Sequence, residues 1–212
     1  MLKAIVLSAE NDPAPLIDIL EEGRLFEIEQ GIDPETLLAD PEASFDYDLF
    51  IIDGRPPVVS HGAQLNFDHS LASGAGLLLI RAATDPARPW PLIERLAIWL
   101  RDGVTQASVH QRIQFLDHYH PVTRGLRDFE IDDFPVKALE IPHPAVHQIL
   151  ATASPCPTLA TEWIANPAFI STSHGRGRVF HSMLNADAPG EPIRRTLARA
   201  AEWAATGNVL DF

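Results

Sequence analysis

Apolar positions along the first half of the chain recur with two different periods. Short, mostly apolar runs typical of strands occur at residues 3–7, 25–29, 48–53 and 74–80. Apolar residues at helical spacing occur at 15–22, 33–38, 61–72 and 91–101. Because buried strands that alternate with helices form parallel sheets covered on both faces, this half predicts a flavodoxin-like α/β fold.

The second half is richer in strands and loops. Strands are expected at 111–116, 136–141 and 147–153, and a hairpin at 168–173 and 178–184. Gly175-Arg176-Gly177 would form the hairpin turn, a polar connection covers 117–126, and a last helix covers 192–205. The sequence shows no internal repeat and no low-complexity linker, so we expect one domain over residues 1–212. Its sheet should be mainly parallel, with a strand-rich C-terminal portion.

Composition and charge exclude several classes of function. Of the 212 residues, 46% are hydrophobic, which is enough for one substantial core. A formal net charge of −13 argues against nucleic acid and anionic membranes as partners, because both attract clustered Lys and Arg. We find no apolar run long enough to span a membrane. A single cysteine excludes an internal disulfide framework, and a cytoplasmic location is expected.

Three strand ends should meet at one edge of the sheet, where open α/β folds bind ligands. They are followed by residues 8–11, 53–55 and 81–85. In many α/β enzymes the last of these turns carries a nucleophile, but here it carries Arg81, and an always-protonated guanidinium cannot attack. The one cysteine, Cys156, lies between two prolines in an expected loop. These residues do not predict glutaminase chemistry, which needs a Cys nucleophile beside a His.

Six segments taken in chain order resemble the ThuA-like (trehalose-utilisation-like) proteins. They are Ile80–Asp85 with Trp90-Pro91, His120–Leu126, Ile131–Asp133, Leu150–Ala153, Gly175–Phe180 and Ala201–Ala204. The resemblance implies the class I glutamine amidotransferase-like fold and, more weakly, a role in sugar utilisation.

The sequence departs from that family pattern at three places. Arg81 stands where the family usually has His, and His181-Ser182 continues a strand that the family follows with Gly-His. The family's acidic pair before an aromatic residue is Asp132-Asp133 here. The resemblance therefore does not carry the family's histidine chemistry to this chain.

Candidate site residues follow from the turns and from the resemblance. Arg81, Arg55 and Asp85 would bind a polar ligand, and Trp90 would stack on a sugar ring. His120 and Asp133 would handle protons.

Several of these residues also have a structural alternative. Arg81 can pair with Asp85, and Asp85 can cap the following segment. His120 can cap the turn before Pro121, or form a metal set with His118 and a carboxylate, and Asp133 can lie in a solvated turn.

Three functions remain open at this point. The leading hypothesis is a protein that binds or transforms a small sugar-like ligand without a cofactor. The second is a non-catalytic, degenerate domain that acts as an oligomeric interaction module, since a homo-oligomer is compatible with the sequence. The third is a metal-dependent hydrolase or isomerase, although no metal site is assigned.

Overall fold

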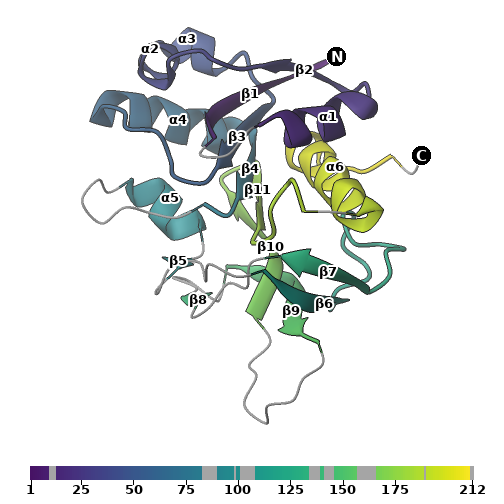
Figure 1. Cartoon of the computed structure of the whole chain (residues 1–212). Helices are drawn as coiled ribbons and strands as arrows, with labels where there is room; N and C mark the ends of the chain where they lie inside the picture. Colours follow the sequence, from purple (N-terminus) through teal and green to yellow (C-terminus); the bar gives the residue numbers. More distant parts are fainter. Residues whose placement is uncertain are drawn as a thin grey trace.

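In the computed structural model the described residues build one mixed nine-stranded sheet flanked by helices (Figure 1). The described ranges are 1–9, 13–82, 90–97, 99–100, 108–133, 139–140, 146–156, 166–188 and 190–210. The sheet strands are β1 (Leu2–Ala9), β2 (Phe26–Glu29), β3 (Leu49–Asp53), β4 (Gly76–Ile80), β6 (Val109–Phe115), β7 (Phe129–Asp133), β9 (Gln148–Pro155), β10 (Asn166–His174) and β11 (Gly177–Ser182). The helices are α1 (Ala14–Glu22), α2 (Pro34–Ala39), α3 (Pro41–Ser44), α4 (His61–Ser73), α5 (Pro91–Leu96) and α6 (Glu191–Thr206).

The strand order is β2-β1-β3-β4-β11-β10-β9-β6-β7. Pairs from β2 to β11 are parallel, and pairs from β11 to β7 are antiparallel. β11 joins the two parts, since it runs parallel to β4 and forms the expected hairpin with β10. The predicted α/β class, with a parallel first part and a strand-rich C-terminal portion, is confirmed.

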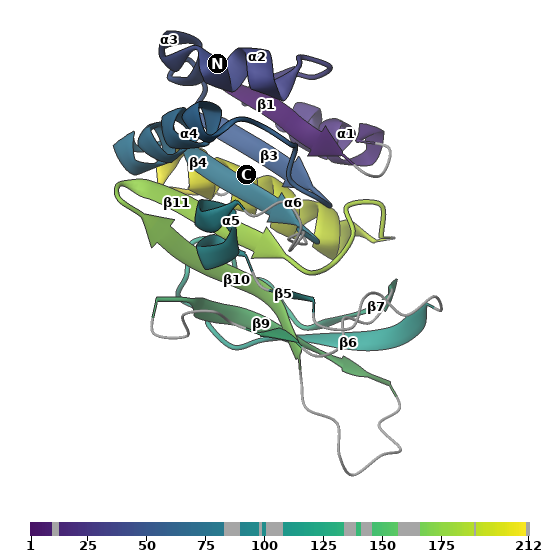
Figure 2. The ribbon, with the colours of Figure 1, turned by 90° about the vertical axis from the view of Figure 1, so that its left-hand side faces the viewer.

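The central parallel strands β3 and β4 are buried on both faces, as their mostly apolar sequences predict. Along β4, Leu78 and Ile80 belong to the core shared with α1 and α6, whereas Leu77 and Leu79 belong to the core shared with α4 and α5. This alternation follows from the two-residue period of a strand. Figure 2 shows α6 behind the sheet and α4 and α5 in front of it.

Helix α6 approaches the sheet closely because β4 begins with glycine. A Cβ built on Gly76 would lie 2.5 Å from the carbonyl carbon of Ala204. At the start of β11, Arg178 Nε donates to the carbonyls of Trp203 and Ala204 at 2.9 and 3.0 Å. The C-terminal end of α6 therefore lies at the amino ends of β4 and β11.

The structure differs from the predicted elements at two places. The expected helix over 91–101 is wrong after Leu96, because Ala97 takes an extended conformation and Trp99–Leu100 (β5) pairs with Leu139–Glu140 (β8). Within the expected strand 136–141, only Leu139 and Glu140 are described. Strand β7 was not predicted, although its buried and exposed residues alternate. Among the described helices, none is both long and apolar enough to cross a bilayer.

Candidate functional site

The carboxyl ends of β3, β4 and β11 lie level with one another. Ile80 is the register partner of both Asp53 and Ser182. Gly54, with φ of 80°, turns the chain after β3, and its N–H donates to the Ile80 carbonyl at 2.9 Å. The expected meeting of the turns is confirmed for the described residues at 53–55 and 81–82.

Arg81 follows β4 directly and adopts a left-handed backbone conformation. Its φ is 46°, which non-glycine residues rarely adopt. Its N–H donates to the Ser182 carbonyl at 2.7 Å, which continues the pairing of β4 with β11 past the last strand residue. A strained turn at a strand end is the backbone geometry that presents a nucleophile in α/β enzymes. Here the same kind of turn carries a guanidinium that is only 8% exposed.

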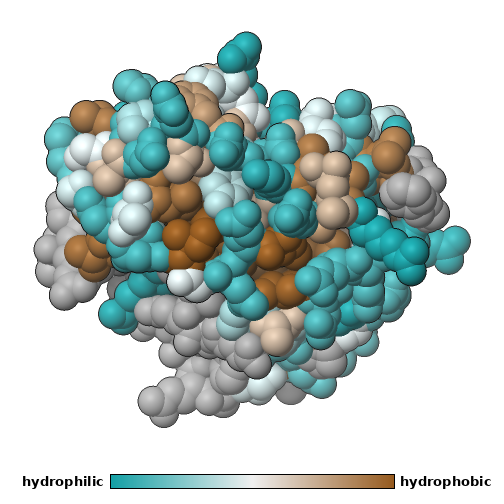
Figure 3. Space-filling model, turned by 90° about the horizontal axis from the view of Figure 1, so that it is seen from above, coloured by the Kyte–Doolittle hydropathy of each residue, from teal (hydrophilic) through white to brown (hydrophobic). Residues whose placement is uncertain are grey.

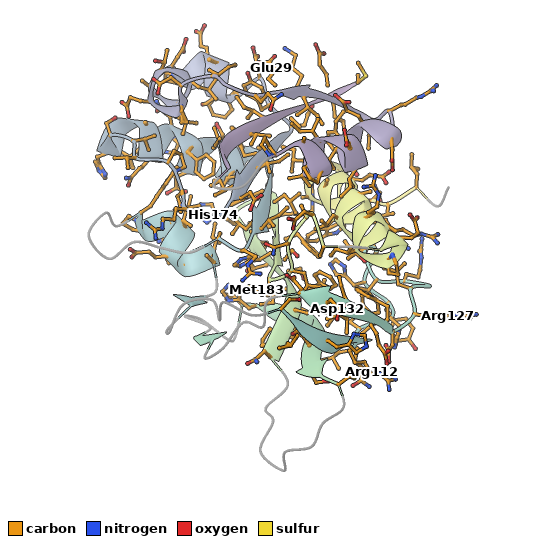
Figure 4. All side chains as sticks on the ribbon, viewed as in Figure 1. Glu29, Arg112, Arg127, Asp132, His174 and Met183 are labelled. Carbon is orange, nitrogen blue, oxygen red and sulfur yellow. The ribbon has the colours of Figure 1, made fainter. Side chains whose placement is uncertain are left out.

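Asp133, the last residue of β7, forms a buried ion pair with Arg81. The Oδ1 atom of Asp133 lies 3.5 Å from an Nη atom of Arg81, and the two side chains are 2% and 8% exposed. Asp133 also accepts hydrogen bonds from the backbone N–H and the side-chain amide of Asn185, both at 3.0 Å. These contacts tie the end of β7 to the loop after β11. Figure 4 labels Asp132, which precedes Asp133 on β7, and Met183, which follows the end of β11, and shows both near the centre of the molecule.

Carboxylates surround the Arg81 guanidinium. Burial lowers the pKa of Arg81, while Asp133, Asp53 and Asp187 act in the opposite direction. Because an arginine pKa starts far above neutrality, the side chain remains protonated. Of the three carboxylates, Asp53 and Asp133 are each 3% exposed, whereas Asp187 is exposed. One buried cation is thus set among three acidic side chains.

Two histidines lie buried on the α5 side of the sheet. Burial, reinforced by nearby His147, lowers the pKa of His181 to about 3, so this imidazole is neutral at physiological pH. His147 Nε2 lies 3.2 Å from the Leu96 carbonyl at the end of α5. An imidazole with so low a pKa is a weak base, which gives it little capacity for proton transfer near neutral pH. His181 lies on β11, within the strand that the sequence predicts at 178–184, and His147 was not singled out.

His120 does not join the cluster at the strand ends. Its ring packs edge-on against Trp203 with centroids 4.6 Å apart, and its Nδ1 accepts from the Val122 N–H at 3.2 Å. Trp203 lies at the C-terminal end of α6, beside the amino end of β11. The expectation that His120 shares the crevice with Arg81 is therefore wrong. The physical reason is local: Asp117 accepts from the His120 N–H at 3.1 Å and turns this segment against α6.

Trp90 is a core residue in this structure. It is 3% exposed, and its ring lies 5.1 Å from Phe67 of α4 in an edge-to-face arrangement. No face is left for stacking on a sugar, so this expectation is also wrong. Arg55 is exposed just after β3, and Asp85 lies outside the described residues.

The sequence missed three members of the cluster, Asp53, Asn185 and Asp187. Asp53 ends a buried strand and is recognisable from its position, although only the turn as a whole was singled out. Asn185 carries no local signal, because its contact with Asp133 depends on the tertiary fold. In the described part of the chain, no three His, Cys, Asp or Glu side chains are grouped so that they could hold a metal ion.

No protein-family model matches the sequence, and no curated protein matches it either. Solved structures do match. A ThuA-like protein from Parabacteroides merdae superimposes with a TM-score of 0.76 at 20% identity, covering 100% of this chain and 92% of that chain. A ThuA-like protein from Bacteroides uniformis gives 0.66 at 13% identity, with 98% and 94% covered. The glutaminase domain of Trypanosoma brucei CTPS, with bound acivicin, gives 0.57 at 10% identity, with 100% and 96% covered.

These likenesses cover nearly the whole of each chain. The protein has the class I glutamine amidotransferase-like fold, shared with ThuA-like proteins and with a glutaminase domain. The fold implied by the sequence resemblance is confirmed.

Proposed function

We propose that this protein is a ThuA-like binding protein or enzyme for a small polyhydroxylated ligand, such as a sugar or a sugar derivative, and that it has no glutaminase activity. The observation that carries the proposal is Arg81. It occupies a left-handed turn at the end of β4 and is ion-paired with Asp133. The ligand would bind over the carboxyl ends of β3, β4 and β11.

The groups at these strand ends suit hydroxyl groups. Asp53 and Asp133 supply carboxylate acceptors, Asn185 supplies an amide, and Arg81 supplies a forked donor. Arg81 would orient the ligand, and Asp133 would accept or return a proton if a reaction follows. Arg55, exposed at the end of β3, would contact the ligand from the rim. Asp85 stays a ligand-binding candidate from its position in the sequence alone. The sugar class itself rests on the resemblance to ThuA-like proteins, as does a cytoplasmic role in carbohydrate utilisation.

The absence of glutaminase activity follows from the side chains available. Glutamine hydrolysis of this type needs a thiolate and a histidine base. Arg81 provides neither, because its guanidinium stays protonated and is not nucleophilic. The backbone N–H of Cys156 donates to the His110 carbonyl at 2.9 Å, at the start of β6 and not at the end of β4.

Calorimetric titration with a panel of sugars and sugar acids tests the proposal. We expect saturable binding of at least one compound, and weaker binding by at least tenfold in Arg81→Lys, which keeps the charge but loses the planar fork. Arg176→Gln is the matched control, because this exposed arginine lies on the β10–β11 turn. Failure of the whole panel to bind, or equal affinity of Arg81→Lys and the wild type, would count against the proposed site.

A second candidate function is favoured by one observation. Both carboxylate oxygens of Asp133 already accept hydrogen bonds within the protein. A buried carboxylate that accepts its hydrogen bonds from the protein itself is typical of a structural cluster. Such a cluster would suit a non-catalytic domain that assembles with copies of itself. Sedimentation analysis discriminates: an oligomer whose stability is unchanged by every compound in the panel supports this reading.

A further inference from the structure

A hollow of about 420 Å³ lies between α1, the start of β2 and α6. Its volume falls within the range of small-molecule sites, about 300 to 1,000 Å³. The molecular surface that carries α1 to α3 and β2 is mostly hydrophilic, with hydrophobic patches between the polar side chains (Figure 3). The proposed function makes no use of this hollow, so the two sites can be tested independently.

The floor of the hollow is apolar. Leu20 of α1 and Phe26 of β2 line it and are 2% and 6% exposed. Ala198 of α6 lines it and is partly exposed, so this helix leaves room where a larger side chain would fill the space. Leu210 lines it from beyond α6 and is held there by its N–H, which donates to Glu202 at 2.9 Å. An occupant would therefore bury an apolar body against these side chains.

Most charged groups around the hollow are already engaged. Arg194 forms an ion pair with Glu22 of α1 at 2.6 Å, which links the two helices. Arg199 is 8% exposed and donates to the carbonyls of Pro121 and Arg124 at 2.7 and 2.9 Å. Arg194 and Arg199 therefore stabilise the fold in addition to lining the hollow.

Arg195 differs from its neighbours. It lines the same hollow, is exposed, and forms no ion pair or side-chain hydrogen bond with any residue in the described ranges. An exposed arginine beside an apolar hollow can hold an anionic head group through charge-assisted hydrogen bonds. Glu191 lies four residues before Arg195 on α6 and Arg199 four residues after it, and both also line the hollow.

We infer that this hollow binds a small amphipathic carboxylate, with its apolar body against Leu20, Phe26 and Leu210 and its carboxylate on Arg195. Apolar burial supplies affinity, and the guanidinium supplies selection for an anionic head. A cation or a neutral head group would gain the apolar contact but would lose the ion pair.

Octanoate is the probe, with 1-octanol and octylamine as matched head-group controls. Binding is followed by amide chemical shifts of the isotopically labelled full chain. We expect octanoate to shift amides of α1, the start of β2 and α6, and to bind more tightly than either control. Arg195→Gln should weaken octanoate binding about fivefold, as expected for an exposed ion pair.

Two further variants make the test specific. Ala198→Phe fills the hollow from a partly exposed position and should abolish binding while the circular dichroism spectrum is kept. Arg176→Gln, at the β10–β11 turn, should leave binding unchanged. The inference is overturned if octanoate does not bind, if all three probes bind equally, if Ala198→Phe binds as the wild type does, or if the shifts fall elsewhere.

Discussion

Replacement of Arg81 by methionine tests whether its ion pair with Asp133 is truly buried. Methionine keeps an unbranched apolar stem but is shorter than arginine and lacks the charged guanidinium. The Asp133 side chain, 2% exposed, would then lose this cation while the hydrogen bonds from Asn185 remain. A carboxylate left in a buried position without a counter-charge is strongly destabilising.

The expected loss can be given a magnitude. Removing one partner of a buried ion pair reduces stability by about 3–5 kcal/mol. Because Asn185 still satisfies Asp133, we expect a value near the lower end, about 3 kcal/mol. For a domain of this size, about 2–4 °C of melting temperature is lost per kcal/mol, so Arg81→Met should melt roughly 6–12 °C below the wild type.

Urea unfolding followed by tryptophan fluorescence, together with thermal melts, measures this loss. Arg112→Met is the matched control, because Arg112 pairs with Asp128 at 3.3 Å but is 55% exposed. Its removal should change stability by less than about 1 kcal/mol. The double variant Arg81→Met/Asp133→Asn should lose less than the sum of the two single losses, by about 0.5–3 kcal/mol. Equal, small losses for Arg81→Met and Arg112→Met would refute the burial argument.

Three shorter predictions address other parts of the molecule. Arg81→Cys should release no ammonia from glutamine, since burial and the surrounding carboxylates would raise the thiol pKa; turnover above wild type would contradict this. Asp132 and Glu130 raise the pKa of His110, so the pairing is present below pH 6.5 and is lost as the pH rises through the raised pKa. Asp132→Asn should lower that pKa in an NMR titration, and an unchanged value would contradict the pairing. Gly76→Ala should destabilise by about 1–3 kcal/mol or more because its Cβ meets α6, whereas Gly62→Ala should not, because a Cβ there meets Ser60 Oγ only at 3.9 Å; similar unfolding midpoints would refute the close packing.

Elements with strong local patterns were predictable from the sequence. Short apolar runs predicted β3 and β4, and the glycines at 175 and 177 predicted the β10–β11 hairpin. Strand β7 was missed because its Asp132-Asp133 end resembles a polar turn, although Asp133 points into the protein. The helix after Pro91 was predicted too long. Apolar residues continue at helical spacing beyond Leu96, but Trp99 and Leu100 pair as a strand instead.

The site was only partly predictable for the same reason. Arg81 and Asp133 were both singled out, but their contact joins residues 52 positions apart and depends on how the sheet brings β7 toward β4. His120 and Trp90 were misplaced because their types suit a sugar site, whereas their packing partners, Trp203 and Phe67, decide their positions. Side-chain chemistry indicates a candidate, and only the tertiary contacts show which candidates meet.

An NMR titration of the labelled protein with sugars and sugar acids tests the central claim most directly. The account predicts that one class of compound shifts the backbone amides of Gly54, Arg81 and Asn185 together, and that Arg81→Lys weakens the effect at least tenfold. Shifts confined to other parts of the molecule, or no shift with any compound, would contradict a ligand site at the carboxyl ends of β3, β4 and β11.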